Sequence, residues 1–261
     1  MSDMPLLRVI DIGKRFTERR GLFRKETVCA LAHVSFSLNP GETLALVGEA
    51  GSGKSTLAKI LAGVVAPTEG EIQIDGHLLP PDDYEQRCKQ IRMIFQDPNS
   101  SLNPRLRIGR ILEAPLMLNT DMTPEERAHK VQETLRMVGL LPDHALFYPQ
   151  MISSGQKQRV ALARALIMSP RIIVADETFS MLDLSVRSQI INLLLKLQEE
   201  LGIAYVIVAN DLGLVRHISD KVIVMHQGRV VETGTTQSVF ANPQHEVTKR
   251  LIQSYGHEYR R

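Results

Sequence analysis

Short apolar runs recur along the whole chain, and most of them have the length of a β-strand. They are residues Leu7–Ile12, Val34–Leu38, Thr43–Val47, Arg92–Phe95, Ile172–Ala175, Tyr205–Ala209, Lys221–Met225 and Arg229–Glu232. Helical patterns fall between several of these runs, and strands that alternate with helices indicate an α/β layer fold with a largely parallel sheet. The last two runs are separated only by HQG, which predicts a β-hairpin.

The segment 97–170 has helical patterns and little strand signal. Thr123 is expected to cap one of its helices, with Glu126 reaching back to Thr123 and Gly139 ending the helix. We interpret this segment as an α-helical subdomain inserted within a single domain that spans residues 1–261.

Residues 14–25 (KRFTERRGLFRK) are strongly basic. We interpret them as a solvated loop between two strands, and contact with anionic lipid or nucleic acid remains an alternative. The rest of the chain is balanced, because the 261 residues carry a formal net charge of only +2. Bulk electrostatics therefore do not indicate a nucleic-acid partner.

Cys29 and Cys88 are the only two cysteines. Two scattered cysteines are typical of reduced thiols in a cytosolic protein and not of a disulfide framework. The N-terminal residues lack the apolar core of a signal peptide, and no apolar run approaches the ~18 residues of a membrane span. We therefore expect a chain that does not itself cross a membrane.

Residues 48–56 (GEAGSGKST) match the pattern G-x-x-x-x-G-K-[ST] between a predicted strand and a predicted helix. The glycines let backbone N–H groups turn inward around phosphate oxygens. Lys54 places a cation on the outer phosphates, and Ser55 offers a hydroxyl to Mg²⁺. The predicted phosphate-binding residues are Gly48, Glu49, Ala50, Gly51, Ser52, Gly53, Lys54, Ser55 and Thr56.

Two other apolar strands also end in polar side chains. Asp176 and Glu177 directly follow one of them. With a phosphate loop upstream, Asp176 is expected to hold Mg²⁺, directly or through water, and Glu177 to polarise the attacking water. Gln96 follows the other strand and is expected to reach the metal or the water, and to report nucleotide state to the helical segment.

Residues 152–159 (ISSGQKQR) open a further helix pattern. A Ser-Ser-Gly start exposes N–H groups and hydroxyls at the positive end of a helix, and ordinary N-capping is the alternative interpretation. The segment resembles the signature motif, usually written LSGGQ, of the ATP-binding cassette (ABC) family. The phosphate loop, Gln96, the acidic pair and residues 180–183 (SMLD) occur in the family's order and approximate spacing, so the resemblance covers nearly the whole chain.

The resemblance implies a P-loop NTPase cassette, with a RecA-like parallel sheet, an antiparallel β subdomain and the inserted helical subdomain. It also implies that two cassettes dimerise head to tail. Each ATP, with Mg²⁺, then lies between one chain's phosphate loop and the other chain's signature helix. Phe16 matches the position expected to stack on adenine, and a core role at a strand end is its alternative. The other implied nucleotide contacts are Ser153, Ser154, Gly155, Gln156 and Asp183.

Three segments resemble the oligopeptide/dipeptide branch of the family. They are residues 95–98 (FQDP), 101–105 (SLNPR) and 242–245 (NPQH). In this branch residues 235–261 would form a short C-terminal extension. Residues 137–144 and 157–159 are similar to the ATPases of a narrower group of peptide transporters, associated with antimicrobial-peptide uptake and resistance.

The branch implies an ATP-hydrolysing subunit that powers a membrane peptide importer. The implied partners are two transmembrane permease subunits, a second ABC ATPase and, indirectly, a periplasmic peptide-binding protein; nucleic acid is not expected. A heterodimer of cassettes is favoured, with a homodimer as the alternative. The implied location is the cytoplasmic face of the bacterial inner membrane, as a peripheral subunit. Neither the cargo nor the direction of transport can be inferred from these residues.

Four residues depart from the family pattern. Ser154 stands where glycine is usual, and Thr178-Phe179 replaces a step that often contains proline. Asn210 stands where the family places a histidine that contacts the γ-phosphate. A neutral or longer bond there would lose about 1–3 kcal/mol, or roughly 5- to 150-fold in rate. We therefore hypothesise that this chain's own ATP site hydrolyses slowly beside a partner ATPase.

Other interpretations of the sequence remain. A regulatory cassette that closes on ATP without useful turnover agrees with the departures at Asn210 and Ser154, although Lys54 and Glu177 argue against it. An ABC ATPase that acts on ribosomes or DNA usually carries two cassettes or long coiled-coil insertions, and this chain has neither. A small-molecule P-loop kinase would have no use for a signature helix.

Overall fold

The computed structural model describes residues 4–20, 24–97, 101–180 and 182–258. Within these residues a six-stranded sheet has the order β10-β9-β3-β8-β7-β6. Its strands are β3 (Thr43–Gly48), β6 (Ile91–Ile94), β7 (Ile172–Asp176), β8 (Ala204–Val208), β9 (Lys221–His226) and β10 (Arg229–Thr235). All neighbours pair in parallel except β9 and β10, which form the predicted hairpin.

A second, antiparallel sheet has the order β2-β1-β4-β5 in the described part of the chain. Its strands are β1 (Leu7–Arg20), β2 (Arg24–Leu38), β4 (Glu69–Ile74) and β5 (His77–Leu78). β1 pairs with β4 as far as Gly13, and from there the β1–β2 hairpin continues alone.

The expectation of a basic loop over residues 14–25 is wrong, because 14–20 and 24–25 belong to these two strands. Arg15 and Thr17 are exposed, as is Val28 on the opposite strand. A hairpin that extends beyond its sheet has no buried face, so its sequence lacks the alternation by which strands are found.

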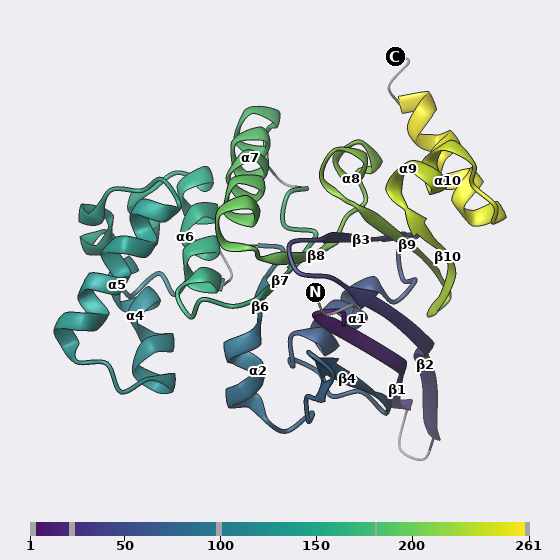
Figure 1. The fold of residues 1–261 in the computed structure, drawn as a ribbon, viewed down its shortest axis with the longest axis horizontal. Coiled ribbons are helices and arrows are strands. Elements are labelled where there is room, and N and C mark those ends of the chain that lie inside the picture. The colour runs from purple at the N-terminus through teal and green to yellow at the C-terminus, as the bar shows by residue number, and fades with distance from the viewer. Residues whose placement is uncertain (1–3, 21–23, 98–100, 181, 259–261) are drawn as a thin grey trace.

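Helices cover both faces of the six-stranded sheet (Figure 1). On one side lie α1 (Lys54–Leu61) and the antiparallel sheet; on the other lie α6 (Ser154–Leu166), α7 (Leu184–Leu201) and α8 (Leu212–Ile218). Leu44 and Leu46 pack into the core on the α1 side of the sheet. Ala45 and Val47 pack into the core on the side of α6, α7 and α8. A strand buried on both faces needs apolar residues at every position, which explains the continuous apolar runs.

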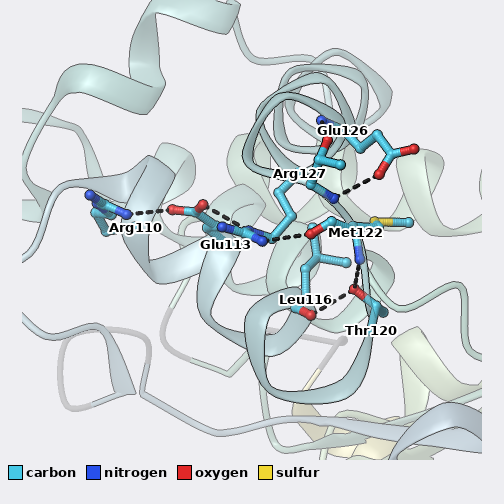
Figure 2. Close-up of polar contacts among 8 residues, drawn as sticks. Arg110, Glu113, Leu116, Thr120, Met122, Glu126 and Arg127 are labelled. Carbon is cyan, nitrogen blue, oxygen red and sulfur yellow. Dashed lines mark hydrogen bonds and ion pairs between the residues drawn. The ribbon is translucent and has the colours of Figure 1, made fainter.

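A helical region lies between β6 and β7. It contains α4 (Ile108–Asn119), α5 (Pro124–Met137) and α6, with short 3₁₀ turns η1 (Pro142–Leu146) and η2 (Pro149–Met151) before α6. Thr123 caps α5 in a capping box with Glu126, as predicted. Arg127 Nε donates to Glu113 Oε1 at 3.0 Å, and Arg127 Nη1 donates to the Met122 carbonyl at 2.7 Å, which ties α5 to α4 (Figure 2).

The remaining helices are α2 (Tyr84–Gln90), α9 (Thr236–Ala241) and α10 (Glu246–Glu258). The carboxylate of Glu232 accepts the backbone N–H groups of Gln244 and His245, both at 2.9 Å, and so fixes the turn before α10. No helix within the described residues is both long enough and apolar enough to cross a membrane. The predicted fold class, α/β with a parallel sheet, an antiparallel sheet and a helical region, is confirmed.

Candidate nucleotide site

The candidate catalytic side chains lie at the carboxyl ends of neighbouring parallel strands. The phosphate loop follows β3, Glu177 follows β7, Asn210 lies just after β8, and Gln96 lies just after β6. Because the carboxyl ends of parallel strands meet at one edge of a sheet, four segments that are distant in sequence form one cluster.

Two glycines give the phosphate loop its path. Gly48 has φ 147° and Gly53 has φ 101°, conformations that residues with a side chain rarely adopt. A Cβ on Gly48 would lie 2.2 Å from the Met225 carbonyl oxygen, and one on Gly53 would lie 2.8 Å from the Ala30 carbonyl oxygen. The loop therefore passes close to two other backbones before it enters α1, whose N-terminus can receive an anion.

Lys54 is buried inside its own loop, with only 4% of its surface exposed. Its Nζ donates to the carbonyl oxygens of Gly48 at 2.8 Å and Glu49 at 2.9 Å. Burial lowers the pKa of Lys54, whereas the charges of Glu177 and Asp176 oppose that change. The ammonium is therefore held at the cluster of acids, next to the turn that would receive phosphate.

Asp176 and Ser55 meet beside this lysine. Ser55 Oγ donates to Asp176 Oδ1 at 2.9 Å, and Asp176 is 8% exposed. Burial raises the pKa of Asp176, and the Ser55 hydrogen bond partly opposes it. A buried carboxylate next to a hydroxyl offers the hard oxygen ligands that Mg²⁺ prefers, so these two residues fit a metal that is completed by phosphates and water.

Glu177 is held by two amides. Asn210 Nδ2 donates to Glu177 Oε1 at 2.9 Å, and Gln96 Nε2 donates to Glu177 Oε2 at 3.3 Å. The backbone of Glu177 has φ 48°, and its N–H donates to the Val208 carbonyl at 3.1 Å. A left-handed conformation at a residue other than glycine costs on the order of 1–3 kcal/mol and is concentrated at functional sites.

The signature residues form a second group at the start of α6. Ser153 Oγ accepts from Gln156 N at 3.3 Å, and Gln156 Oε1 accepts from Ser153 N at 2.9 Å. Ser153 is therefore the N-cap of α6 and forms a full capping box with Gln156. Gln156 Nε2 also lies 3.3 Å from His144 Nε2 in η1. Ser154 is the first residue of the helix and is exposed.

Two other predicted nucleotide contacts lie on separate elements. Phe16 on β1 is 38% exposed, so it is not a core side chain, and Lys14 Nζ lies 5.0 Å from its ring centroid. Asp183 is the N-cap of α7, where its carboxylate accepts from Val186 N at 2.9 Å. Asp183 thus has a structural role that the resemblance did not indicate.

Sequence reasoning missed Arg187. Its Nη1 forms an ion pair with Asp211 Oδ2 at 2.7 Å, and Asp211 is the N-cap of α8. Arg187 lies on an amphipathic helix and its partner is 24 residues away, so no local pattern marks the pair. In the sequence Thr178 is marked only as a departure from the family, yet its buried Oγ1 donates to the Ile94 carbonyl at 3.3 Å and so joins β6 to the acidic pair.

A phosphate loop after a central parallel strand, with an acidic pair at the end of a neighbouring strand, defines a P-loop nucleoside triphosphatase.

A family model described as "ABC transporter" matches residues 31–180. SapF of Escherichia coli K12, named a putrescine export ATP-binding protein, is 58% identical over 95% of this chain and 92% of its own length. SapF of Salmonella typhimurium, named a peptide transport ATP-binding protein, is 57% identical with the same coverage. DppF of Haemophilus influenzae, named a dipeptide transport ATP-binding protein, is 47% identical over 96% of this chain and 78% of its own length.

Solved structures agree with this assignment. The dimeric ATP-binding cassette MJ0796, in a post-hydrolysis state with ADP and Pi, has a TM-score of 0.75 and 33% identity, covering 88% of this chain and 98% of that one. The cassette cbiO1 from Clostridium perfringens, part of an ABC transporter complex, has a TM-score of 0.78 and 28% identity, covering 99% of this chain and 100% of that one. The chain belongs to the ABC transporter family and is an ATP-binding ATPase of its peptide-transporter branch. The resemblance inferred from the motifs is thereby confirmed.

Proposed function

We propose that this chain hydrolyses ATP to power a membrane importer of peptides. The names of the Sap and Dpp relatives support peptide as the cargo class, although one SapF is named for putrescine. Antimicrobial peptides are the narrower cargo that we propose. The chain would act as a peripheral subunit on the cytoplasmic face of the bacterial inner membrane, bound to two permease subunits.

The side chains divide the work of hydrolysis. The backbone N–H groups of the phosphate loop and the Lys54 ammonium hold the outer phosphates once Lys54 turns away from the Gly48 and Glu49 carbonyls. Ser55 and Asp176 would hold Mg²⁺. When bound, Mg²⁺ supplies positive charge against the phosphate oxygens. Glu177 orients the attacking water and accepts its proton.

The observation that carries this proposal is the position of Glu177, next to the Ser55–Asp176 pair and between the amides of Asn210 and Gln96. Glu177→Gln keeps the size of the side chain and removes the base. In the assembled complex of full-length subunits we expect phosphate release at this chain's own site to fall at least about 100-fold. Glu199→Gln, on the exposed surface of α7, is the matched control and should leave the rate unchanged. An unchanged rate in Glu177→Gln would show that hydrolysis occurs elsewhere.

We propose a head-to-tail dimer with a second cassette, in which Ser153, Ser154, Gly155 and Gln156 complete the partner's ATP site. The exposed start of α6 and the dimeric MJ0796 structure support this arrangement. A heterodimer is favoured, because in a homodimer the departures at Asn210 and Ser154 would affect both sites. The periplasmic peptide-binding protein would act on the complex only indirectly. Mass measurement of the purified complex tests the stoichiometry.

We propose that a permease docks in the groove beside β6. The groove has a volume of about 580 Å³, and its lining includes Arg92, Phe95 and Arg164. Because two arginines, Arg92 and Arg164, line the groove beside Phe95, it is electropositive and suits an acidic segment with apolar neighbours. A partner bound there would touch both the strand that leads to Gln96 and the helix that begins with the signature. Arg92→Glu should uncouple peptide uptake from ATPase activity; unchanged uptake would contradict the docking site.

A catalytically weak or regulatory cassette is the second candidate function. Asn210 favours it, because a neutral amide there meets the catalytic carboxylate where the family has a histidine. In that case the partner cassette performs most hydrolysis, and Glu177→Gln in this chain leaves most of the ATPase activity of the complex intact.

A further inference from the structure

Arg187 lies between two functional segments and connects them. It is in the first turn of α7, where its Nη1 forms a 2.7 Å ion pair with Asp211 Oδ2. Its Nη2 donates to the Leu182 carbonyl at 3.5 Å, in the segment that precedes α7. The two side chains of the pair are only 19% and 34% exposed, so solvent screens their attraction less than at a fully exposed pair.

Asp211 transmits the position of Arg187 to the catalytic cluster. Its other oxygen, Oδ1, accepts the backbone N–H groups of Gly213 at 2.9 Å and Leu214 at 3.1 Å. Both carboxylate oxygens are therefore engaged, and Asp211 is held between α7 and α8. The preceding residue, Asn210, directs its amide to Glu177. A displacement of Asp211 would shift the backbone that carries this amide.

The same turn of α7 packs tightly against the start of α6. A Cβ on Gly155 would lie 2.9 Å from Cγ1 of Val186, the residue before Arg187. That distance is too short for a real contact, so glycine at this signature position permits the close approach. A movement of the signature helix is therefore transmitted to the turn that contains Arg187.

One atom of Arg187 supports a role beyond a surface ion pair. Its Nε is buried and has no hydrogen-bond partner among the described residues. A buried donor without a partner is unfavourable, and such groups in native proteins call for an explanation. If Arg187 served only to pair with Asp211, a cationic side chain without a buried Nε–H would form that pair at less cost.

We propose that Arg187 is a positioning residue that holds the Asn210–Asp211 turn against α7, and so couples the signature helix to Glu177. This proposal rests on the proposed function, because it requires Glu177 to assist hydrolysis. In the head-to-tail dimer the signature helix contacts the partner's ATP, whereas Glu177 acts on the chain's own ATP. Arg187 therefore links the two ATP sites of the dimer through a single chain.

The test is a double-mutant cycle on the assembled complex of full-length subunits, with kcat and KM for ATP measured separately. Arg187→Gln should lower kcat roughly tenfold or more and leave KM within about twofold, because displaced catalytic groups slow the chemical step. Arg187→Lys should recover part of the rate, because it keeps the charge at Asp211 but not the fork that also reaches Leu182. In an Asn210→Ala background, Arg187→Gln should cause no further loss.

Several outcomes would overturn the proposal. One is an unchanged kcat in Arg187→Gln, and another is a change confined to KM. The third is a loss of kcat on Arg187→Gln that is as large in the Asn210→Ala background as in the unaltered chain. Arg127→Gln, which breaks a comparable ion pair in the helical region, is the matched control for lost stability. If it lowers kcat as much for the same drop in melting temperature, the role of Arg187 is structural only. Glu177→Gln separates the two proposals: if it leaves the rate unchanged the proposed function fails, and if it abolishes the rate any failure belongs to Arg187 alone.

Discussion

The amide of Asn210 donates a 2.9 Å hydrogen bond to Oε1 of Glu177, although 33 residues separate them in sequence. The family resemblance implies a position for Asn210 at the γ-phosphate. The structure joins it to the candidate catalytic carboxylate of Glu177, on the opposite side from Gln96, which contacts Oε2. Asn210 is therefore in a position to influence the rate through Glu177 as well as through phosphate.

The first prediction concerns this residue. Asn210→His should raise the steady-state ATPase rate of the assembled complex by about 5- to 150-fold, because an imidazole reaches further and can make a charge-assisted bond. Phosphate release at saturating ATP measures the effect. Asn210→Gln, which lengthens the side chain but stays neutral, is the control for reach alone. An unchanged or lower rate in Asn210→His would contradict a slow site caused by Asn210.

The second prediction concerns the metal site. Asp176→Asn should abolish Mg²⁺-dependent hydrolysis and yet stabilise the nucleotide-free chain by about 1 kcal/mol, because it removes a buried carboxylate and keeps an acceptor for Ser55. Removal of Mg²⁺ with EDTA should stop hydrolysis in the unaltered chain as well. Full activity after either change would mean that Ser55 and Asp176 do not hold the metal.

The stability gain in Asp176→Asn should depend on pH. Burial raises the folded-state pKa of Asp176 above its ordinary value of 3.8, so the folded state binds the proton more tightly than the unfolded state. The contribution of Asp176 to stability therefore falls as pH rises from 3.8 through its folded-state pKa, and the advantage of Asn over Asp at this position is complete above that window. Urea unfolding at several pH values measures it, and an advantage that does not grow with pH would exclude this cause.

The third prediction concerns the polar network in Figure 2. Glu113→Gln should lower the free energy of unfolding by about 1–3 kcal/mol at pH 7, because it leaves Arg127 with a weaker partner in a mostly buried contact. The Arg127 hydrogen bond lowers the pKa of Glu113 below its ordinary value of 4.5, against the effect of burial. The stabilisation is therefore present above pH 4.5 and is lost as pH falls through the folded-state pKa.

Denaturant unfolding of both forms at neutral and acidic pH checks this prediction. Glu246→Gln removes an exposed carboxylate that pairs with Lys249 on α10, and its unfolding midpoint should not change. A constant difference between the unaltered chain and Glu113→Gln across the acidic range would mean that the charge of Glu113 is not the cause.

The fourth prediction concerns adenine. Phe16→Ala should weaken ATP binding by about 1–3 kcal/mol, the usual contribution of one base stacked on an aromatic ring. Phe16→Tyr preserves a ring and should bind ATP normally. Inorganic tripolyphosphate, which has no base, should bind all three forms equally in calorimetry. Equal ATP affinity in Phe16→Ala would remove Phe16 from the site.

The sequence was most informative where the determinants are local or periodic. The phosphate loop is nine contiguous residues, and its glycines, Gly48, Gly51 and Gly53, all have positive φ. Thr123 and Glu126 cap α5 across three residues, and the buried strands are visible because both of their faces meet a core. The basic hairpin was missed for the opposite reason, since exposed strands carry no apolar alternation.

The tertiary structure decided which of these local features meet. Ser55 and Asp176 are 121 residues apart and become hydrogen-bond partners only because β3 and β7 both pair with β8. Arg187 had no motif to mark it, because its partner was set by how α7 packs beside the end of β8. The sequence by itself therefore determined the strands of the six-stranded sheet, the phosphate loop and the family. Which side chain contacts Glu177, and what holds that side chain in place, depend on long-range packing that no local pattern encodes.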